Sequence, residues 1–371
     1  MAALKRLLLV GGGHAHVHVL AALAEAPLAD CQVTLISPWP RQIYSGMLPG
    51  WIAGHYSIDD CAIAIDQLAQ RAGVRFLETS CSRLDLAAQI AHCASGEQVA
   101  FDLVSINSGP TVALDRLPGA EQYAIPIRPI EGFVARWPGI LDRARQQTSG
   151  FNLAIVGDGA AGTELAFAVQ ARFARERLAH CRVTLLGANR SPLAGFPARL
   201  RQTVCRLLEE HGIRHLAERR AVAFLPGKLR LADQCLLAAD ASLIATGADA
   251  PHWPADSALA TDESGFIRLT PTLQSVSHPF VFAAGDVAAY ADPRPKSGVF
   301  AVRAGPILAH NLRAACRGEP LQSWLPQAQA LYLISTGQRH ALAARGSFSI
   351  GGNWVWRWKD WIDRRFMRRF S

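Results

Sequence analysis

The sequence contains the same local pattern twice: an apolar run, a glycine-rich turn, a helix-like segment and a second apolar run. In the first copy the two apolar runs are Leu7–Val10 and Gln32–Ser37. In the second copy they are Phe151–Val156 and Cys181–Leu186. A strand, a glycine turn, a helix and a second strand within about 30 residues form a βαβ unit. The repeat therefore predicts an α/β chain with two parallel sheets.

Each turn has glycines where the backbone must approach a phosphate closely. The second turn has the full set, Gly157, Gly159 and Gly162. The first turn has Gly11 and Gly13, but His16 occupies the position where a small residue normally lets the helix pack on the strand. The N–H groups and the positive end of the following helix favour a pyrophosphate. We expect one dinucleotide at each turn.

The first turn continues into three histidines at alternate positions, His14, His16 and His18. Only His14 and His18 share one face of a helix. No third ligand is evident in the sequence, so we do not predict a metal site. A packing role or a contact to a phosphate is the remaining interpretation, and both stay open here.

Neither second strand ends in the acidic residue that usually binds a ribose hydroxyl. Ser37 and Gly187 stand at those positions instead. Arg41 and Arg190 follow shortly after them. An arginine near this place can accept a 2′-phosphate. The sequence therefore leaves NADH and NADPH both open, and Arg190 on a solvated loop is the simpler alternative.

Further strand-like runs end in glycine, and two glycine- or proline-containing stretches, 110–119 and 247–254, resemble hinges. We infer that the second unit is inserted into the first. The predicted division is 1–112 and 246–320 for the first dinucleotide-binding domain, 113–245 for the inserted domain, and 321–371 for a short C-terminal module.

Composition narrows the function classes. No apolar run approaches the roughly 18 residues of a membrane span, and the run after Lys5 and Arg6 is too short for a signal peptide core. We therefore expect a cytoplasmic chain. No two of the eight cysteines form a CxxC pair, which argues against a zinc ribbon or a thioredoxin-type motif.

The net charge of +8 is uneven along the chain. Residues 354–371 hold six Lys or Arg against two Asp, with four of the nine tryptophans. Because the rest is only mildly basic, we do not expect a nucleic-acid partner. Aromatic rings and arginines suit a lipid headgroup region, which predicts peripheral contact at the inner face of a membrane. The alternative is that the tryptophans pack on the protein or form a homodimer seam.

The two glycine turns, the run Ala245–Gly247 and the run Ala284–Asp286 resemble those of the pyridine nucleotide-disulfide oxidoreductases that bind two dinucleotides. Within that superfamily the chain is similar to type II NADH dehydrogenases. It is most similar to the branch found fused to selenide, water dikinase, whose pattern is carried by the strings Gly11–Leu20, Tyr44–Gly50, Ala53–Tyr56, Arg294–Arg303 and Trp356–Met367. The resemblance covers essentially the whole chain. The resemblance implies a glutathione-reductase-like fold with two Rossmann-like domains, FAD in the first and NADH or NADPH in the second.

The resemblance also implies roles for individual residues. Glu164 would lie where the nicotinamide meets the flavin, although it could equally cap the helix. Asp286 would bind the ribityl chain. The full set of expected cofactor-binding residues is Gly11, Gly13, His14, His16, Ser37, Arg41, Met47, Leu48, Pro49, Ser108, Gly109, Gly157, Gly159, Gly162, Arg190, Gly247, Gly285, Asp286, Gly298 and Val299.

The sequence also departs from its relatives. The two glutamines that bind quinone in type II NADH dehydrogenases correspond to Val299 and Arg303. Arg303, assisted by Lys296, could instead favour an anionic reduced flavin, or could form a simple ion pair. The expected activity is an FAD-dependent NAD(P)H dehydrogenase with a quinone or another small acceptor. A redox sensor with little turnover is the alternative, and a sulfide- or selenide-linked oxidoreductase is a minor one.

Overall fold

A five-stranded parallel sheet joins the first repeat to a segment far along the chain. The computed structural model describes residues 4–370. The strand order of this first sheet is β19-β9-β1-β2-β5. Its members are β1 (Lys5–Val10), β2 (Cys31–Ser37), β5 (Arg75–Glu78), β9 (Leu103–Ile106) and β19 (Val281–Ala283). Leu7, Leu8 and Leu9 are almost wholly buried, as expected for a parallel strand covered on both faces.

Helix α1 (His14–Glu25) follows β1 and packs along α9 (Gly298–Arg317). Smaller elements complete this half of the molecule. They are β3 (Arg41–Ile43), α2 (Leu48–Ile52), a 3-10 turn (Asp59–Cys61), β4 (Ala62–Ala64), α3 (Ile65–Arg71), β6 (Cys81–Asp85), β7 (Ile90–Cys93), β8 (Gln98–Ala100), α8 (Trp253–Asp256), β18 (Ile267–Arg268), a second 3-10 turn (Gly285–Val287) and β20 (Ala288–Ala289).

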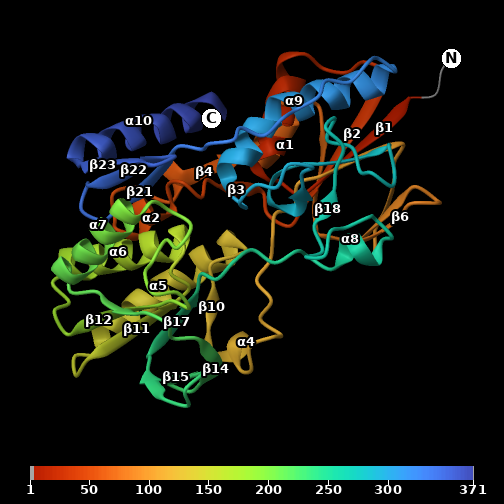
Figure 1. The fold of residues 1–371 in the computed structure, drawn as a ribbon. Helices are drawn as coiled ribbons and strands as arrows, with labels where there is room; N and C mark the ends of the chain where they lie inside the picture. Colours follow the sequence, from red (N-terminus) through yellow and green to blue (C-terminus); the bar gives the residue numbers. More distant parts are fainter. Residues whose placement is uncertain (1–3, 371) are drawn as a thin grey trace.

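The second repeat builds a second parallel sheet, with the order β10-β17-β11-β12-β13. Its strands are β10 (Ile125–Pro126), β11 (Phe151–Val156), β12 (Cys181–Leu186), β13 (Arg214–Leu216) and β17 (Ala241–Ile244). The remaining elements are α4 (Ala120–Tyr123), α5 (Ile130–Gln146), α6 (Ala160–Arg175), α7 (Ala198–Glu210) and the antiparallel strands β14 (Ala221–Leu225), β15 (Lys228–Leu231) and β16 (Leu236–Ala238). Figure 1 shows the two sheets in opposite halves of the molecule.

The chain crosses twice between the halves, and the two crossings lie side by side. Thr111 and Asp249 exchange backbone hydrogen bonds of 2.9 and 3.0 Å. The Asp249 carboxylate also accepts the Ala113 N–H at 3.0 Å. This pairing fits an inserted second unit, although the domain boundaries given above remain predictions. The predicted α/β class with two parallel sheets is confirmed.

The C-terminal part forms a three-stranded antiparallel sheet and a long helix. These elements are β21 (Tyr332–Ser335), β22 (Ala341–Arg345), β23 (Phe348–Gly352) and α10 (Asn353–Phe370). Figure 1 shows α10 above the sheet of β21, β22 and β23, with α2 and α6 below that sheet. Within residues 4–370, no helix is long and apolar enough to cross a membrane.

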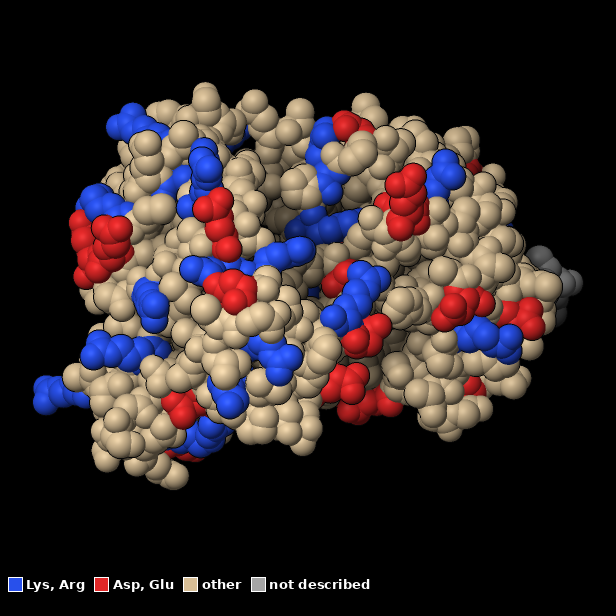
Figure 2. All heavy atoms as spheres, turned by 60° about the horizontal axis from the view of Figure 1, so that its bottom comes forward, with Lys and Arg blue, Asp and Glu red and all other residues tan. Residues whose placement is uncertain are grey.

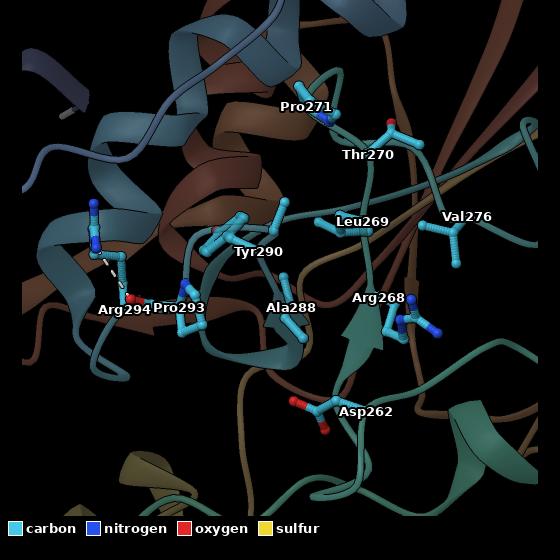
Figure 3. A pocket seen from close by; sticks show the side chains of 12 residues that line it. Asp262, Arg268, Leu269, Thr270, Pro271, Val276, Ala288, Tyr290, Pro293 and Arg294 are labelled. Carbon is cyan, nitrogen blue, oxygen red and sulfur yellow. Dashed lines mark hydrogen bonds between the residues drawn. The ribbon is translucent and has the colours of Figure 1, made fainter.

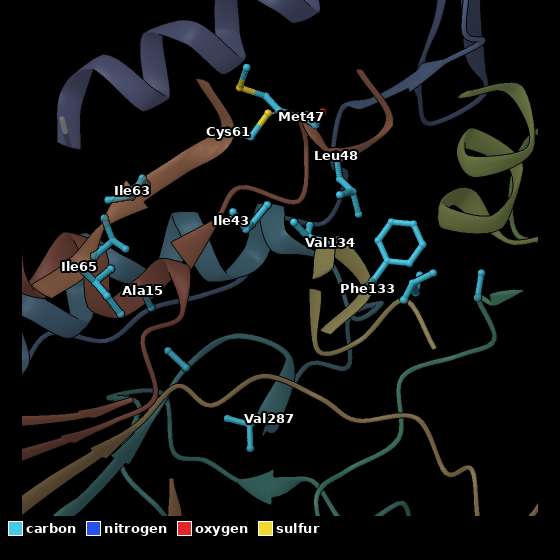
Figure 4. Packing of buried hydrophobic residues seen from close by; sticks show 14 of the residues in the cluster. Ala15, Ile43, Met47, Leu48, Cys61, Ile63, Ile65, Phe133, Val134 and Val287 are labelled. Carbon is cyan, nitrogen blue, oxygen red and sulfur yellow. Dashed lines mark hydrogen bonds between the residues drawn. The ribbon is translucent and has the colours of Figure 1, made fainter. Parts of the chain in front are cut away.

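One hydrophobic core continues from one half of the molecule into the other. Phe133 and Val134 of α5 belong to the same buried cluster as Met47 and Leu48. Figure 4 shows Phe133 on the side of Leu48, and Met47 beside Cys61. Because the core is shared, the segment around Leu48 is held firmly against the second unit.

Candidate active site

The first glycine turn fits tightly against the loop that follows β9. Gly11 has a positive φ of 92°, and a Cβ there would lie 2.5 Å from the Cα of Ser108. A Cβ at Gly13 would collide with the Asn107 side chain. Only glycine therefore allows this close approach. Ser108 and Gly109 continue the same loop, so the structure brings two predicted parts of the first site together.

Asn107, which the sequence analysis did not select, joins the loop after β9 to the start of α1 and to the end of β19. Its Oδ1 accepts the N–H groups of Ala15 at 3.0 Å and His16 at 3.2 Å, in the first turn of α1. Its Nδ2 donates to the Ala284 carbonyl at 2.6 Å, just after β19. The side chain therefore holds the first turn of α1 against β9 and β19. In the sequence, only its position two residues before Gly109 could have indicated that Asn107 belongs to the first site.

The three histidines of α1 are buried and neutral. The ring of His16 makes two hydrogen bonds, with the Gly11 carbonyl at 2.6 Å and with the Ser105 hydroxyl at 2.8 Å. The rings of His14 and His18 pack edge-on against Tyr44 and Phe370. Burial lowers the pKa of each histidine to about 4. The rings thus serve packing, and His16 has no ring nitrogen left for a phosphate.

Both residues predicted at the end of β2, Ser37 and Arg41, have partners within the protein. The Ser37 hydroxyl is buried and donates to the Trp39 carbonyl at 3.0 Å. Arg41 pairs with the largely buried Glu131 of α5 at 3.1 Å. A carboxylate already occupies this guanidinium, so a 2′-phosphate would have to compete with Glu131 for it.

Asp286 lies in the 3-10 turn after β19, opposite two cations. Its carboxylate is 3.5 Å from the Arg128 guanidinium, and its side chain is 12% exposed. Burial raises the pKa of Asp286, while Arg128 and Lys296 act in the opposite direction. Lys296 donates to the Ala288 carbonyl at 2.6 Å, and burial lowers its pKa to about 8. Lys296 therefore lies beside the predicted ribityl site.

The start of α9 approaches the segment before α2. A Cβ at Gly298 would lie 3.3 Å from the Ser45 hydroxyl, so the predicted flavin segments converge here. Met47, Leu48 and Pro49 are buried. Val299 is partly buried, whereas Arg303 is exposed further along α9.

The second glycine turn is tighter than the first. Gly157 has a positive φ of 111°, and a Cβ there would lie 2.6 Å from the carbonyl carbon of Ala245. A Cβ at Gly162 would collide with the Gly157 carbonyl oxygen. Gly159 is the N-cap of α6 and has no side-chain cap. The N–H groups of this helix start thus lack a side-chain acceptor, which favours an anion.

The other two predicted residues of the second site, Arg190 and Gly247, make few contacts. Arg190 is 90% exposed, and its guanidinium lies 3.3 Å from the Glu218 carboxylate. A Cβ at Gly247 would meet nothing within 4 Å. The solvated ion pair of Arg190 agrees with the simpler of its two predicted roles.

Glu164 points from the first turns of α6 toward the C-terminal sheet. Its Oε1 accepts the Ser335 N–H at 2.8 Å. The residue keeps some exposed surface, but protein atoms surround its carboxyl group closely. Burial raises the pKa of Glu164 to about 7, although Lys359 and the Ser335 N–H act in the opposite direction.

Lys359 and Asp363 of α10 form a buried ion pair that the sequence analysis missed. Their N–O distance is 2.6 Å, and the Lys359 ammonium also donates to the Gly46 carbonyl at 2.5 Å. Burial opposes the charge of Lys359, but Asp363 and Glu164 more than offset it and raise its pKa. Lys359 is one of the six basic residues of 354–371, but its side chain is buried and points inward, so it does not belong to the exposed basic face of α10.

Two tyrosines fasten α10 to the first half. Tyr56 donates to Asp360 at 2.6 Å, and its ring fills the space beside Gly50. Tyr44 stacks on Phe366 with ring centroids 4.5 Å apart. Burial raises the pKa of both tyrosines, and the neighbouring Asp360 and Asp363 add to the effect. α10 therefore covers the segment that is expected to approach the flavin.

A cavity of about 510 Å³ lies apart from both glycine turns (Figure 3). Its lining comes from the segment 262–294, and no predicted cofactor residue belongs to it. Tyr290 connects it to the first site, because its hydroxyl accepts the Gly285 N–H at 2.9 Å. This contact supports the Asp286 turn from behind.

The arrangement fits two dinucleotides. Both turns bring backbone too close for any side chain, and each opens a helix. Figure 2 shows a hollow between the two halves with Lys and Arg side chains along it. Positive charge at such a hollow attracts phosphates.

Comparisons with known proteins agree with this geometry. Residues 5–305 match the family described as pyridine nucleotide-disulphide oxidoreductase. The NADH dehydrogenase-like protein YutJ of Bacillus subtilis is 24% identical over 329 residues, which cover 87% of each chain. The Alternative NAD(P)H-ubiquinone oxidoreductase C1 of Arabidopsis thaliana is 22% identical over 93% of this chain and 74% of its own length.

Solved structures share the fold. The sulfide:quinone oxidoreductase of Aquifex aeolicus has a TM-score of 0.81 at 17% identity, covering 99% of this chain and 91% of its own. NDH2 of Plasmodium falciparum, solved with NADH, has a TM-score of 0.80 at 12% identity, covering 98% of each chain.

The predicted resemblance to type II NADH dehydrogenases is confirmed at the level of these NADH dehydrogenase-like relatives. The link to the branch fused to selenide, water dikinase stays a prediction. The match over residues 5–305 covers most of the sequence, and the two glycine turns lie inside it. The chain belongs to the pyridine nucleotide-disulphide oxidoreductase family.

Proposed function

We propose that the chain is an FAD-dependent NAD(P)H dehydrogenase that delivers electrons to a small acceptor. The observation that carries this proposal is the meeting of three elements near Glu164. Lys359 of α10 interacts electrostatically with Glu164 of α6. The Lys359 ammonium also donates a hydrogen bond to the Gly46 carbonyl, in the segment expected near the flavin. The names of the NADH dehydrogenase-like relatives support the same activity.

The residues of this chain would bind and orient the two cofactors. The turns at Gly11 and Gly157 would hold the two pyrophosphates, and Asp286 would accept a ribityl hydroxyl. Bound FAD would supply the redox chemistry by taking a hydride from NAD(P)H and passing two electrons on. The shared core around Leu48 would keep the two binding sites at a fixed separation.

A quinone is the acceptor that we favour. Reduction of a quinone by NAD(P)H consumes one proton from the surroundings in addition to the hydride. Glu164 can hold that proton near neutral pH, because burial raises its pKa to about 7. The Arabidopsis relative is named for ubiquinone, which supports this choice. Val299 cannot hydrogen-bond a quinone carbonyl, so other groups would have to orient the acceptor.

The raised pKa of Glu164 predicts a pH dependence of turnover. We expect quinone reduction to fall as the pH rises through about 7, because the protonated fraction of Glu164 declines. In Glu164→Gln this ionisation should vanish, and turnover below pH 7 should drop about 100-fold. Steady-state rates at saturating NADH between about pH 5.5 and about pH 9 test this. An unchanged profile in Glu164→Gln would remove the residue from the proton route.

The raised pKa of Glu164 also makes the free energy of unfolding depend on pH. The folded pKa of about 7 lies above the ordinary value of 4.5, so the neutral carboxyl favours the folded state. This contribution is fully present below pH 4.5 and is lost as the pH rises through about 7. Activity and unfolding should therefore be measured on the same samples, so that partial unfolding is not mistaken for a proton requirement.

Multiple turnover distinguishes the proposed dehydrogenase from the alternative, a redox sensor with little turnover. The FAD-loaded protein, mixed with NADH or NADPH and a water-soluble ubiquinone analogue, should oxidise many equivalents of nucleotide per flavin. A single equivalent consumed without further turnover would favour the sensor and contradict the proposal.

The exposed face of α10 is the proposed membrane contact. Trp354, Trp358 and Trp361 are 53%, 37% and 52% exposed. The Arg365 guanidinium lies 5.2 Å from the centre of the Trp361 ring, and Arg357 and Arg368 are also exposed. Aromatic rings beside arginines suit the headgroup region of an anionic membrane. The cytoplasmic location and the homodimer stay predictions.

Replacing all three exposed tryptophans of α10 with alanine should lower vesicle binding about tenfold or more. The measurement is co-sedimentation of the full chain with vesicles containing phosphatidylglycerol. A matched control changes three exposed apolar residues elsewhere, Leu236, Val276 and Leu325, to alanine. Equal binding by the two triple variants would defeat the membrane hypothesis.

A further inference from the structure

The second dinucleotide site lacks an acid at the end of β12 but gains one from the glycine turn itself. β12 ends at Leu186, and Gly187 follows without a side chain. A Cβ built on Gly187 would collide with the carboxylate oxygen Oδ2 of Asp158. The Asp158 carboxylate therefore occupies the space that the side chain of an acidic residue at position 187, after β12, would need.

Contacts on both sides fix the Asp158 carboxylate in this position. Its Oδ2 lies 3.2 Å from Nε2 of His215 on β13. The Asp158 carbonyl accepts the Leu193 N–H at 2.9 Å and the Thr163 hydroxyl at 3.2 Å. The Asp158 side chain is 7% exposed. Within the described chain, 4–370, its other oxygen, Oδ1, has no hydrogen-bond partner.

The position of this carboxylate points to a ribose. In a βαβ dinucleotide site the adenosine ribose lies at the end of the second strand, beside the first glycines of the turn. A carboxylate there accepts hydrogen bonds from the ribose hydroxyls and repels a 2′-phosphate. We propose that Asp158, positioned by His215, binds the adenosine ribose of the nicotinamide dinucleotide and makes the chain prefer NADH over NADPH. This inference rests on the proposed function, because it assigns the donor for that same site.

The neighbouring charges agree with a preference for NADH. Arg190, the residue that could have accepted a 2′-phosphate, is 90% exposed and pairs with Glu218. A 2′-phosphate would have to break this pair and would also approach Asp158.

Two dinucleotide fragments test the ribose contact without any redox reaction. ADP-ribose and 2′-phospho-ADP-ribose contain the adenosine half alone, and their binding to the FAD-loaded protein can be measured by isothermal titration calorimetry. The unchanged protein should bind ADP-ribose at least about tenfold more tightly than its 2′-phosphorylated form. Asp158→Asn should weaken ADP-ribose binding about tenfold and reduce the discrimination.

A second variant checks the geometry independently. Gly187→Ala introduces a Cβ where the Asp158 carboxylate lies, so it should reproduce the loss seen in Asp158→Asn. The control is Asp142→Asn, which removes an exposed carboxylate that pairs with Arg145 of α5 in the same half. This control should bind both fragments as the unchanged protein does.

The outcomes separate the two proposals. The assignment of Asp158 would be overturned by tighter binding of the 2′-phosphorylated fragment, or by unchanged ADP-ribose affinity in Asp158→Asn. In either case the proposed function would stand if NADH or NADPH still reduced the flavin. Failure of the unchanged protein to bind either fragment would overturn the assignment as well. If, in addition, neither NADH nor NADPH reduced the flavin, the proposed function would fail too.

Discussion

Valine in place of Gly162 is expected to slow the reduction of bound flavin by NAD(P)H about 100-fold. A Cβ at this position would overlap the Gly157 carbonyl oxygen and would lie 3.4 Å from the Ala245 Cβ. The helix α6 must then move away from β11, and the dinucleotide turn moves with it. A displacement of about 1 Å at a positioning element is enough for a loss of this size. Glu164 on the same helix would also shift relative to Ser335.

The proposed FAD site lies at the other sheet, so Gly162→Val should retain its flavin. Stopped-flow reduction at several NADH concentrations measures the effect, and the absorbance ratio of flavin to protein reports the FAD content. The matched control is Gly139→Ala in α5, because a Cβ there meets nothing within 4 Å. Loss of FAD together with slow reduction would mean that the whole fold is damaged. Normal reduction in Gly162→Val would contradict the assignment of this turn to the nucleotide.

Removing the ammonium group of Lys359 is expected to destabilise the protein by about 3–5 kcal/mol. The Asp363 side chain, only 6% exposed, would lose its partner at 2.6 Å and become an uncompensated buried charge. The Gly46 carbonyl would also lose a hydrogen-bond donor. Urea unfolding of the FAD-loaded Lys359→Ala variant at pH 7 measures the loss. A change below about 1 kcal/mol would show that the pair is solvated.

A double replacement separates stability from function. Lys359→Met with Asp363→Leu removes both charges and nearly keeps the volume, so it should lose less stability than Lys359→Ala, although the Gly46 carbonyl and the Tyr44 hydroxyl each lose a partner. Lys359 lowers the pKa of Glu164 more than Asp363 raises it, so the double variant should shift the pH midpoint of turnover upward. A purely structural role for the pair would leave this midpoint in place.

The sequence was informative where local chemistry determines the structure. The glycine turns at Gly11 and Gly157 could be recognised because pyrophosphate binding requires glycine at close backbone approach. The fold class followed from the duplication of strand, turn and helix. Two hinges predicted an inserted unit, and the pairing of Thr111 with Asp249 shows how closely the two crossings lie.

The remaining site residues depend on contacts between distant parts of the chain. Lys359 lies 313 residues from Gly46, and nothing in the tail shows that its ammonium points inward while neighbouring tryptophans point outward. Asn107 acts through carbonyl and amide groups of α1 and β19, which only the folded sheet brings together. For His16 the sequence left packing and a phosphate contact open, because only the folded protein shows that its ring bonds Gly11 and Ser105.

The most direct test of the account is an anaerobic titration of the FAD-loaded protein with NADH and then, in a separate sample, with NADPH. The absorbance band of oxidised flavin is followed after each addition. The account predicts rapid bleaching with NADH near one equivalent per flavin, and weaker, slower bleaching with NADPH. Absence of bleaching by either nucleotide would contradict the claim that the two glycine turns bring a nicotinamide and a flavin together.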